Sequence, residues 1–225
     1  MSQLATLQTF TIGTWNMEGK GSDEHGDFLR AAGASIWLLT EVPDSFRYGD
    51  ADIVRSGAMG PKKAFAAVVA RGLTREVSPH EASAAATWRG VRFICSVLPW
   101  RGAHGEPWLG EDVGERTEHA LRGFDGANDE LVWGGDWNHA FHGPERAGSA
   151  AGRAHIAATL DRLRLRTVTT PLSHRLGEGT IDHIAVPKCW IADRVERLPA
   201  DGLSDHDAYV ATVRPLVRAD RVARS

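Results

Sequence analysis

Short apolar runs are the feature of this sequence that most restricts its fold. The longest uninterrupted apolar run, residues 64–70, has seven residues, whereas a membrane-spanning helix needs roughly 20. Two further segments, SIWLLTEV (35–42) and VRFICSVL (91–98), are also rich in apolar residues, which is typical of strands covered on both faces. We therefore expect a chain built mainly from buried strands, with no membrane span.

Segments with strand patterns outnumber segments with helical patterns. We expect strands at residues 8–15, 35–42, 52–55, 65–70, 84–88, 91–98, 130–133, 180–186, 190–198 and 208–213. We expect helices at residues 23–32, 111–124 and 149–163. No glycine-rich phosphate loop follows the first strand, and no long Pro/Gly/Ser linker divides the sequence. The pattern favours two packed sheets with flanking helices over a Rossmann sheet, in a single domain covering residues 1–225.

Charge and cysteine content exclude several classes of protein. The 26 basic and 29 acidic residues give a net charge of −3, which argues against a basic nucleic-acid coat but not against an enzyme that holds phosphate through a metal ion. Cys95 and Cys189 lie far apart in apolar contexts, so we expect two buried free thiols in a reducing compartment. Residues 1–8 have no basic start and no apolar core, so we expect no signal peptide and a cytoplasmic location.

Polar residues follow several of the expected strands, the position from which a rigid scaffold presents functional groups. These residues are Asn16 after TIGTW, Glu41 after SIWLLT, Asp136 and Asn138 after LVWGG, Asp182 after TI, and Asp205 and His206 in GLSDHD. Each one taken alone has a structural explanation, because Asn, Asp and Ser favour turns and caps. Their order along the chain carries more information than any single residue.

In that order and local context, the residues resemble the endonuclease/exonuclease/phosphatase superfamily, which includes DNase-I-like nucleases. The matching strings are TWNM (14–17), LLTEV (38–42), GGDWN (134–138), TIDHIAV (180–186) and LSDHD (203–207), which span nearly the whole chain. The second, third and fifth strings are fairly specific, whereas the first and fourth are weak alone. The resemblance implies an α/β fold: a four-layer α/β/β/α sandwich with two packed, mostly antiparallel sheets and a site where the sheets open at one end.

The resemblance also implies catalytic roles. Asp136 would position or deprotonate the attacking water, Asn138 would bind the phosphoryl oxygen, and His206 would contact the scissile phosphate. Asp182 would assist His206, because a carboxylate partner raises the pKa of a histidine and fixes its orientation. His183 follows Asp182 directly, and we favour a structural role for it.

The same strand ends offer ligands for Mg²⁺ or Mn²⁺. Glu41 is a hard oxygen donor, the type that Mg²⁺ prefers. Asn16 offers a carbonyl ligand or a group that orients a metal-bound water, and Asp205 offers a second carboxylate near the metal. A zinc site at His139 and His142 is less favoured, because the HxxH spacing lacks further ligands at suitable positions.

One segment departs from the superfamily pattern. Many relatives carry a further histidine at the end of the central strand, where this chain reads ICSVLPWRG (94–102), with Leu98, Pro99 and Trp100 nearest. Arg101 and His104 follow closely, and we include Arg101 among the expected catalytic residues because guanidinium groups suit phosphate. An exposed arginine after a strand is more often simply solvated. The missing histidine disfavours the DNase-I-like and sphingomyelinase-like subfamilies.

The sequence therefore predicts a divalent-metal-dependent phosphoester hydrolase that uses metal-assisted in-line attack of water. A nuclease or other phosphodiesterase is the first choice, so the partner is a phosphoester substrate, with nucleic acid among the options. A phosphatase or phosphodiesterase acting on a small phosphorylated metabolite or lipid head group is the second. A non-catalytic binding module on the same fold is the third. We expect residues 138–153, which hold two histidines and two arginines, to select the substrate.

Overall fold

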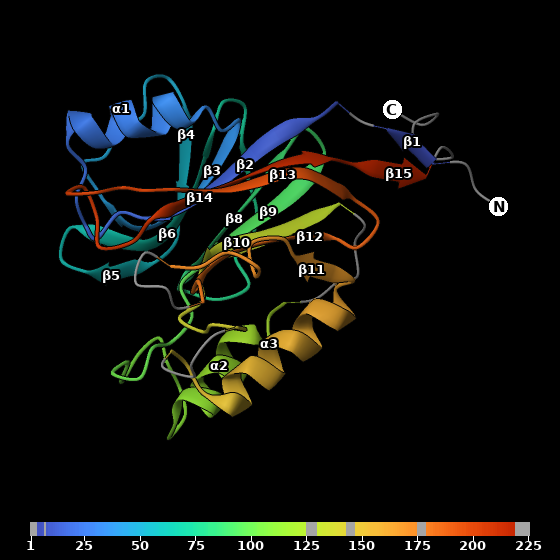
Figure 1. Ribbon diagram of the computed structural model, residues 1–225. Coiled ribbons are helices and arrows are strands. Elements are labelled where there is room, and N and C mark those ends of the chain that lie inside the picture. The colour runs from blue at the N-terminus through green and yellow to red at the C-terminus, as the bar shows by residue number, and fades with distance from the viewer. Residues whose placement is uncertain (1–3, 7, 125–129, 143–146, 175–178, 219–225) are drawn as a thin grey trace.

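Two mixed β-sheets lie face to face, with helices on both outer sides (Figure 1). The computed structural model describes residues 4–6, 8–124, 130–142, 147–174 and 179–218. Residues 143–146, part of the segment expected to select the substrate, therefore lie outside the described residues. The described helices include none that is both long and apolar enough to cross a membrane.

The first sheet has seven strands in the order β13-β14-β2-β3-β6-β4, with β5 also paired to β6. Its strands are β2 (Phe10–Asn16), β3 (Ile36–Pro43), β4 (Asp52–Arg55), β5 (Ala58–Gly60), β6 (Lys63–Ala70), β13 (Ile191–Leu198) and β14 (Ala208–Arg214). Its one parallel pair in the described part of the chain is β2 with β3, where Ile12 lies opposite Ile36 and Asn16 opposite Thr40.

The second sheet has six strands in the order β11-β12-β10-β9-β8-β7. Its strands are β7 (Thr74–Arg75), β8 (Ser83–Trp88), β9 (Val91–Ser96), β10 (Leu131–Asp136), β11 (Leu165–Thr167) and β12 (Asp182–Pro187). Strands β9 and β10 run parallel, and the other described pairs in this sheet are antiparallel. A separate ribbon pairs β1 (Leu4–Thr6) with β15 (Leu216–Arg218). The expectation of mostly antiparallel sheets is confirmed.

Alternation along β3 shows why its sequence is apolar at almost every position. Ile36 and Leu38 belong to the core between the two sheets, whereas Trp37 and Leu39 belong to a second core on the outer face. Successive side chains of a strand point to opposite faces, so a strand covered on both sides needs apolar residues throughout. The helix that covers this outer face is α1 (Asp23–Ala32), which contributes Leu29 to the second core.

Helices α2 (Val113–Leu121) and α3 (Ala150–Arg162) pack together on the opposite side of the molecule, against the six-stranded sheet (Figure 1). Each begins at a side-chain cap: Asp112 accepts a hydrogen bond from the Glu115 backbone N–H, and Ser149 accepts one from that of Gly152, both at 2.9 Å. Such caps satisfy backbone donors that lack a partner inside the helix. With α1 on the other face, the order of layers is α/β/β/α, as expected.

Several element boundaries differ from the expected ones. Helix α2 begins at Val113 rather than at residue 111, because Asp112 is its cap, and it ends at Leu121. Strand β9 ends at Ser96, two residues early, although the Leu98 N–H still donates to the Asp136 carbonyl at 2.9 Å. Strand β10 continues through Gly134 and Gly135 to Asp136. The polar residue that we placed after this strand is therefore its last residue.

Candidate active site

Four of the predicted site residues lie at or near strand ends in the two facing sheets. Asn16 is the last residue of β2, and Glu41 lies near the end of β3. Asp136 ends β10, and Asp182 begins β12, where the antiparallel register places the two aspartates opposite each other. The two sheets thus bring together residues that are up to 166 positions apart in the sequence, from Asn16 to Asp182.

Two glycines allow Asp136 to reach this position. A Cβ on Gly134 would lie 2.6 Å from the His183 carbonyl oxygen, and one on Gly135 would lie 2.3 Å from the Ser96 carbonyl oxygen. Gly135 also has φ +120°, a conformation that side chains other than glycine's rarely adopt. The GGD sequence therefore lets β10 lie tightly between β9 and β12 just before the aspartate.

Asn16 connects the carboxylates of the two sheets. Its side-chain amide donates to Asp136 Oδ2 at 3.0 Å and to Glu41 Oε1 at 3.3 Å. Its amide oxygen accepts from the Glu18 N–H at 2.9 Å, and its backbone carbonyl accepts from the Ser204 hydroxyl at 2.7 Å. This buried asparagine therefore fixes the relative positions of three chain segments.

Asp182 and His206 form a buried ion pair. His206 Nδ1 lies 2.6 Å from Asp182 Oδ2, and the aspartate is fully buried. Burial alone would lower the pKa of His206, but the charge and hydrogen bond of Asp182, together with the charges of Asp136 and Asp205, raise it to about 10. His206 is thus a cation at neutral pH, with Nδ1 donating to Asp182 and Nε2 carrying the other proton.

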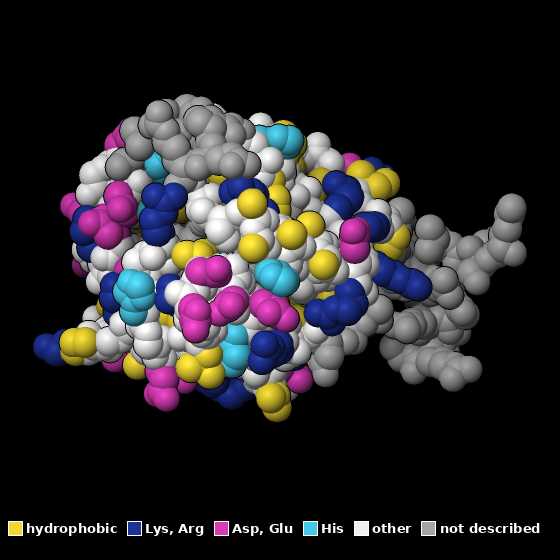
Figure 2. All heavy atoms as spheres, turned by 90° about the horizontal axis from the view of Figure 1, so that it is seen from below, with side chains coloured by type: hydrophobic (Ala, Val, Ile, Leu, Met, Phe, Trp, Pro, Cys, Tyr) yellow, Lys and Arg dark blue, Asp and Glu magenta, His cyan; other side chains and the backbone are white. Residues whose placement is uncertain are grey.

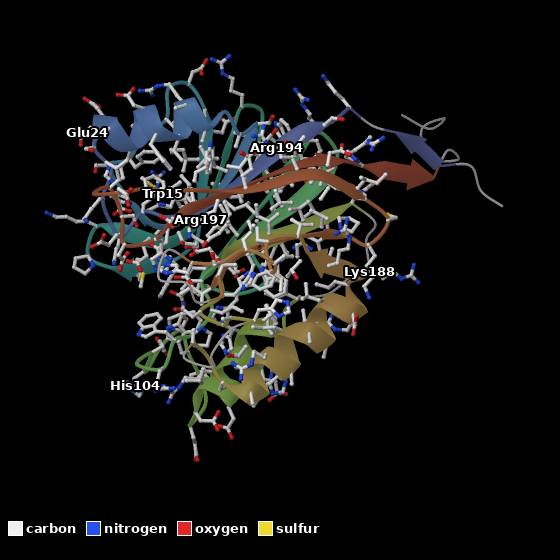
Figure 3. All side chains as sticks on the ribbon, viewed as in Figure 1. Trp15, Glu24, His104, Lys188, Arg194 and Arg197 are labelled. Carbon is white, nitrogen blue, oxygen red and sulfur yellow. The ribbon has the colours of Figure 1, made fainter. Side chains whose placement is uncertain are left out.

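The loop that carries His206 is attached to β2. The Ser204 hydroxyl, which donates to Asn16, accepts from the His206 N–H at 3.1 Å. The indole of Trp15, labelled in Figure 3, donates to the His206 carbonyl at 3.0 Å. Both contacts hold the histidine against the strand that ends in Asn16.

Asp136 has a perturbed pKa as well. Burial, followed by the negative charge of Asp182, raises its pKa to about 7, although the positive charge of His206 and hydrogen bonds from Asn138 and Asn16 oppose the change. A carboxylate with a pKa near neutrality suits a general base. Ligand atoms of Asp136, Asp182 and His206 all lie within 4.8 Å of one another.

Glu41 lies beside this cluster and is paired with a lysine that the sequence interpretation did not identify. Lys63 Nζ lies 2.6 Å from Glu41 Oε2, and the glutamate side chain is 22% exposed. Glu41 itself has φ +51°, an uncommon conformation for a residue with a side chain. The carboxylate of Glu41, which we expect to hold a metal ion, is therefore paired with the positive charge of Lys63.

Asn138 lies at the edge of the cluster. Its backbone N–H donates to Asp136 Oδ1 at 2.9 Å, and its side-chain amide donates to the Leu98 carbonyl at 2.9 Å. The Leu98 side chain is buried, and its backbone carbonyl holds the Asn138 amide in place. One N–H of the Asn138 amide is used in this way, and the amide has a second.

Asp205 lies outside the buried cluster. Its side chain is 59% exposed, with Oδ1 at 4.0 Å from His206 Nε2. Its backbone N–H donates to Glu18 Oε2 at 3.1 Å. Glu18 was missed by the sequence interpretation, although a carboxylate two residues after a strand-ending asparagine is the signal that marks it. The metal role of Asp205 stays a prediction.

Arg101 and His104 are not brought into the cluster by any described contact. Arg101 is exposed and lines a pocket of about 390 Å³ near the starts of α2 and α3, together with Asp112, Ser149 and Arg153. His104 is exposed on a loop near α2 and points away from the sheets (Figure 3). The catalytic role expected for Arg101 stays a prediction that this geometry does not strengthen.

Buried aromatic and histidine side chains pack next to the cluster. Trp137 is fully buried and stacks on Trp133, with ring centroids 4.0 Å apart. His183 Nε2 lies 2.9 Å from the His139 carbonyl, and burial lowers the pKa of His183 to about 4. A neutral, buried His183 agrees with the structural role that we favoured. His139 is buried too, its Nδ1 lying 2.7 Å from the Trp137 carbonyl, which does not favour a zinc site there.

The surface around α2 and α3 is mixed in charge. Figure 2, which views the molecule from below relative to Figure 1, shows acidic side chains gathered near the middle of this face, with lysine, arginine and histidine side chains around them. A continuous basic face would be the electrostatic footprint of a nonspecific nucleic-acid binder. The visible face does not have that character.

Comparison with solved structures identifies the class of fold. The endonuclease domain of TRAS1, a telomere-specific non-LTR retrotransposon, is 18% identical, with a TM-score of 0.63 over 92% of this chain and 99% of that domain. An endonuclease/exonuclease/phosphatase protein from Beutenbergia cavernae is 13% identical, with a TM-score of 0.65 over 93% of this chain and 72% of its own. A humanized D. rerio TDP2 is 13% identical, with a TM-score of 0.58 over 91% and 98%.

The chain therefore has the fold of the endonuclease/exonuclease/phosphatase proteins, as the five sequence strings implied. At identities of 18% and 13%, the likeness concerns the fold. No family model matched the sequence, and a search of curated proteins found no match.

Proposed function

We propose that the chain is a divalent-metal-dependent phosphoester hydrolase, most specifically a phosphodiesterase or nuclease. The observation that carries the proposal is the convergence of Asp136, Asp182 and His206, with ligand atoms within 4.8 Å of one another, beside the Asn16–Glu41 contact. Solved structures with a similar fold include a retrotransposon endonuclease domain, which supports phosphoester chemistry on this fold.

The residues present fit a hard divalent cation such as Mg²⁺ or Mn²⁺. Asp182 Oδ1 is buried and has no hydrogen-bond partner among the described residues. Burial and the negative charge of Asp182 raise the pKa of Asp136, and Lys63 pairs with Glu41. A set of oxygen donors with excess negative charge is the environment that Mg²⁺ and Mn²⁺ prefer.

Glu41 would hold the ion, and Asn16 and Asp205 would serve as additional ligands or orient water bound to it. A bound divalent ion supplies charge stabilisation for a phosphoryl oxygen. Asn16 already orients Glu41 and Asp136 through its amide, so its first role is to fix the geometry of the carboxylates.

Asp136 accepts the proton of the attacking water in this proposal. Its pKa of about 7 leaves a large fraction ionised at neutral pH while keeping it basic enough to accept a proton. The hydrogen bonds from the Asn138 N–H and the Asn16 amide hold its two oxygens in place. Water positioned by a fixed carboxylate would then attack the phosphorus in line with the leaving oxygen.

His206 and Asn138 bind the phosphoryl group. The imidazolium, held by Asp182 at Nδ1, offers the Nε2 proton to a phosphoryl oxygen, where a fixed positive charge stabilises the charge of the transition state. The second N–H of the Asn138 amide donates to another oxygen. Both groups are held before substrate arrives, so little reorganisation accompanies the reaction.

A phosphatase or phosphodiesterase acting on a small phosphorylated metabolite or lipid head group is the second candidate. The net charge of −3 and the mixed face in Figure 2 favour it over a tight nonspecific grip on long nucleic acid. The two candidates share the same cluster and differ in the substrate.

The proposal is tested with a substrate panel of single- and double-stranded DNA, RNA, abasic DNA, inositol phosphates and a chromogenic phosphodiester. Each substrate is incubated with Mg²⁺, Mn²⁺ or EDTA, and metal binding is measured in parallel by calorimetry. We expect turnover of at least one phosphoester with metal and none with EDTA. No turnover of any substrate, together with no metal binding, would favour the binding module instead.

A further inference from the structure

A concave site lies at the other end of β3 from the carboxylate cluster. The pocket has a volume of about 720 Å³, and its walls include Ser35 at the start of β3 and Ala70 at the end of β6. Glu41 lies six positions after Ser35, which corresponds to roughly 20 Å along a strand. The volume falls within the range of small-ligand pockets, roughly 300–1,000 Å³.

The rim of this pocket is positively charged. Arg30, Arg71 and Arg89 line it with one acidic residue, Asp50. Arg71 Nε donates to Asp50 Oδ1 at 2.6 Å, and Arg30 pairs with Asp27 on α1. Arg89 takes part in none of the ion pairs of the described residues, and its guanidinium donates a long hydrogen bond, 3.5 Å to Gln8 Oε1. The charge of Arg89 is therefore available to an anion.

Arg89 has a backbone conformation that is unfavourable for arginine. Trp88 pairs with Val91 across the β8–β9 hairpin, so Arg89 and Gly90 form a two-residue turn with φ values of +50° and +79°. Glycine, asparagine and aspartate are the residues preferred in such turns. Residues in unfavourable backbone conformations are found most often at functional sites such as ligand-binding sites.

Aromatic side chains line the pocket, and one of them, Trp88, contacts Arg89. Its guanidinium carbon lies 4.4 Å from the centroid of the Trp88 ring, and Trp88 Nε1 donates to the Arg71 carbonyl at 3.0 Å. The half-buried Tyr48 adds further aromatic surface, whereas Trp37, which also lines the pocket, is fully buried. Val69 and Ala70 complete an apolar floor. A ligand with a flat apolar ring and an anionic group fits these walls and this positively charged rim.

We propose that this pocket binds a small organic anion with a planar ring, of the mononucleotide class, and that Arg89 contacts its anionic group. The ring lies against the aromatic and apolar walls, and the phosphate meets the arginine rim. Guanidinium groups bind phosphate through paired hydrogen bonds. The site is separate from the carboxylate cluster, so this inference does not depend on the proposed hydrolase function.

The test uses the full chain in EDTA at low ionic strength, with calorimetric titration of adenosine 5′-monophosphate, ribose 5-phosphate and inorganic phosphate. The variant is Arg89→Gly, because glycine suits the positive φ of this turn and preserves the hairpin. The matched control is Arg164→Gly, an exposed arginine with φ +56° that does not line the pocket. His206→Ala serves as the control for binding at the carboxylate cluster.

We expect saturable binding of adenosine monophosphate that Arg89→Gly weakens at least about tenfold, whereas Arg164→Gly and His206→Ala bind as the unmodified chain does. Ribose 5-phosphate and phosphate are expected to bind at least about tenfold more weakly, because they lack the ring. The inference is overturned by an absence of binding at millimolar nucleotide, by equal affinity in Arg89→Gly, by equal affinity for ribose 5-phosphate, or by a loss confined to His206→Ala.

Discussion

Replacing Asp182 with asparagine is expected to change the protonation of His206 more than any other single substitution in the site. The pKa of His206 is about 10 because Asp182 overcomes the effect of burial, which on its own lowers that pKa. In Asp182→Asn the burial remains and the nearest charge is gone. The pKa of His206 is therefore expected to fall toward its usual value of 6.5, while the charges of Asp136 and Asp205 continue to raise it.

The energy involved is large. A fall in pKa from about 10 all the way to 6.5, at about 1.4 kcal/mol for each tenfold change in proton affinity, would correspond to roughly 5 kcal/mol, which is the upper bound for this substitution. Breaking a buried ion pair by removing one partner typically costs about 3–5 kcal/mol, which agrees with this figure. The pKa of Asp136 would change as well, because the negative charge of Asp182 helps to raise it.

Nuclear magnetic resonance of the metal-free protein in EDTA measures this directly. The imidazole signals are followed from pH 4 to pH 10, and His206 is assigned by its absence in His206→Gln among the 10 histidines. In the unmodified chain, the His206 signal should keep its protonated position well above pH 8. A His206 midpoint near pH 6.5 in the unmodified chain, or the same midpoint in both proteins, would refute the reasoning.

Three further predictions follow from the same contacts. Lys63→Met is expected to tighten Mn²⁺ binding, measured by calorimetry, about tenfold, because it removes a positive charge 2.6 Å from Glu41. The control Lys62→Met, which replaces an exposed neighbouring lysine, should leave the Mn²⁺ affinity unchanged. Equal Mn²⁺ affinities in the two variants would contradict this prediction. Because the folded pKa of His206 exceeds 6.5, its contribution to the free energy of unfolding is complete below pH 6.5 and is lost as pH rises toward 10. Urea unfolding in EDTA should therefore show a decline from pH 7 to pH 9 that Asp182→Asn lacks, and parallel declines would be inconsistent with the pair. Gly135→Ala is expected to lower the free energy of unfolding by about 3 kcal/mol or more, since its Cβ would lie 2.3 Å from the Ser96 carbonyl oxygen; a near-neutral effect in urea unfolding would argue against that close approach.

The strands that carry the site could be predicted because both of their faces are buried. The run at 35–42 is apolar at nearly every position, and β3 places Ile36 and Leu38 in one core and Trp37 and Leu39 in the other. Short edge strands could not be predicted in this way. Both residues of β7, Thr74 and Arg75, are exposed, so no apolar periodicity marks them.

The residues at strand ends could be predicted from order and residue type, but their partners could not. Lys63 reaches Glu41 because the register of β3 with β6 places Pro43 opposite Lys63, and register is a property of pairing that the local pattern does not contain. Glu18 meets the Asp205 backbone N–H across 187 positions. A turn with φ +53° at Glu18 makes that contact possible, and the three letters MEG do not specify it.

The pocket near Arg89 could not be predicted either. Its arginines come from α1, from the end of β6 and from a hairpin turn, so they share no motif and no spacing. Tertiary folding alone brings Arg30, Arg71 and Arg89 to one rim, whereas the five strings of the carboxylate cluster are recognisable before folding is considered.

The measurement that tests the central claim most directly is the initial rate of hydrolysis of the phosphoester selected by the panel, for the unmodified chain and for Asp136→Asn at equal Mn²⁺ concentration. Circular dichroism and urea unfolding of the variant confirm that it is folded. The account predicts metal-dependent turnover that EDTA abolishes and that Asp136→Asn lowers by about a hundredfold or more, because the general base is lost. Full activity in a folded Asp136→Asn variant would contradict the assignment of this cluster as the active site.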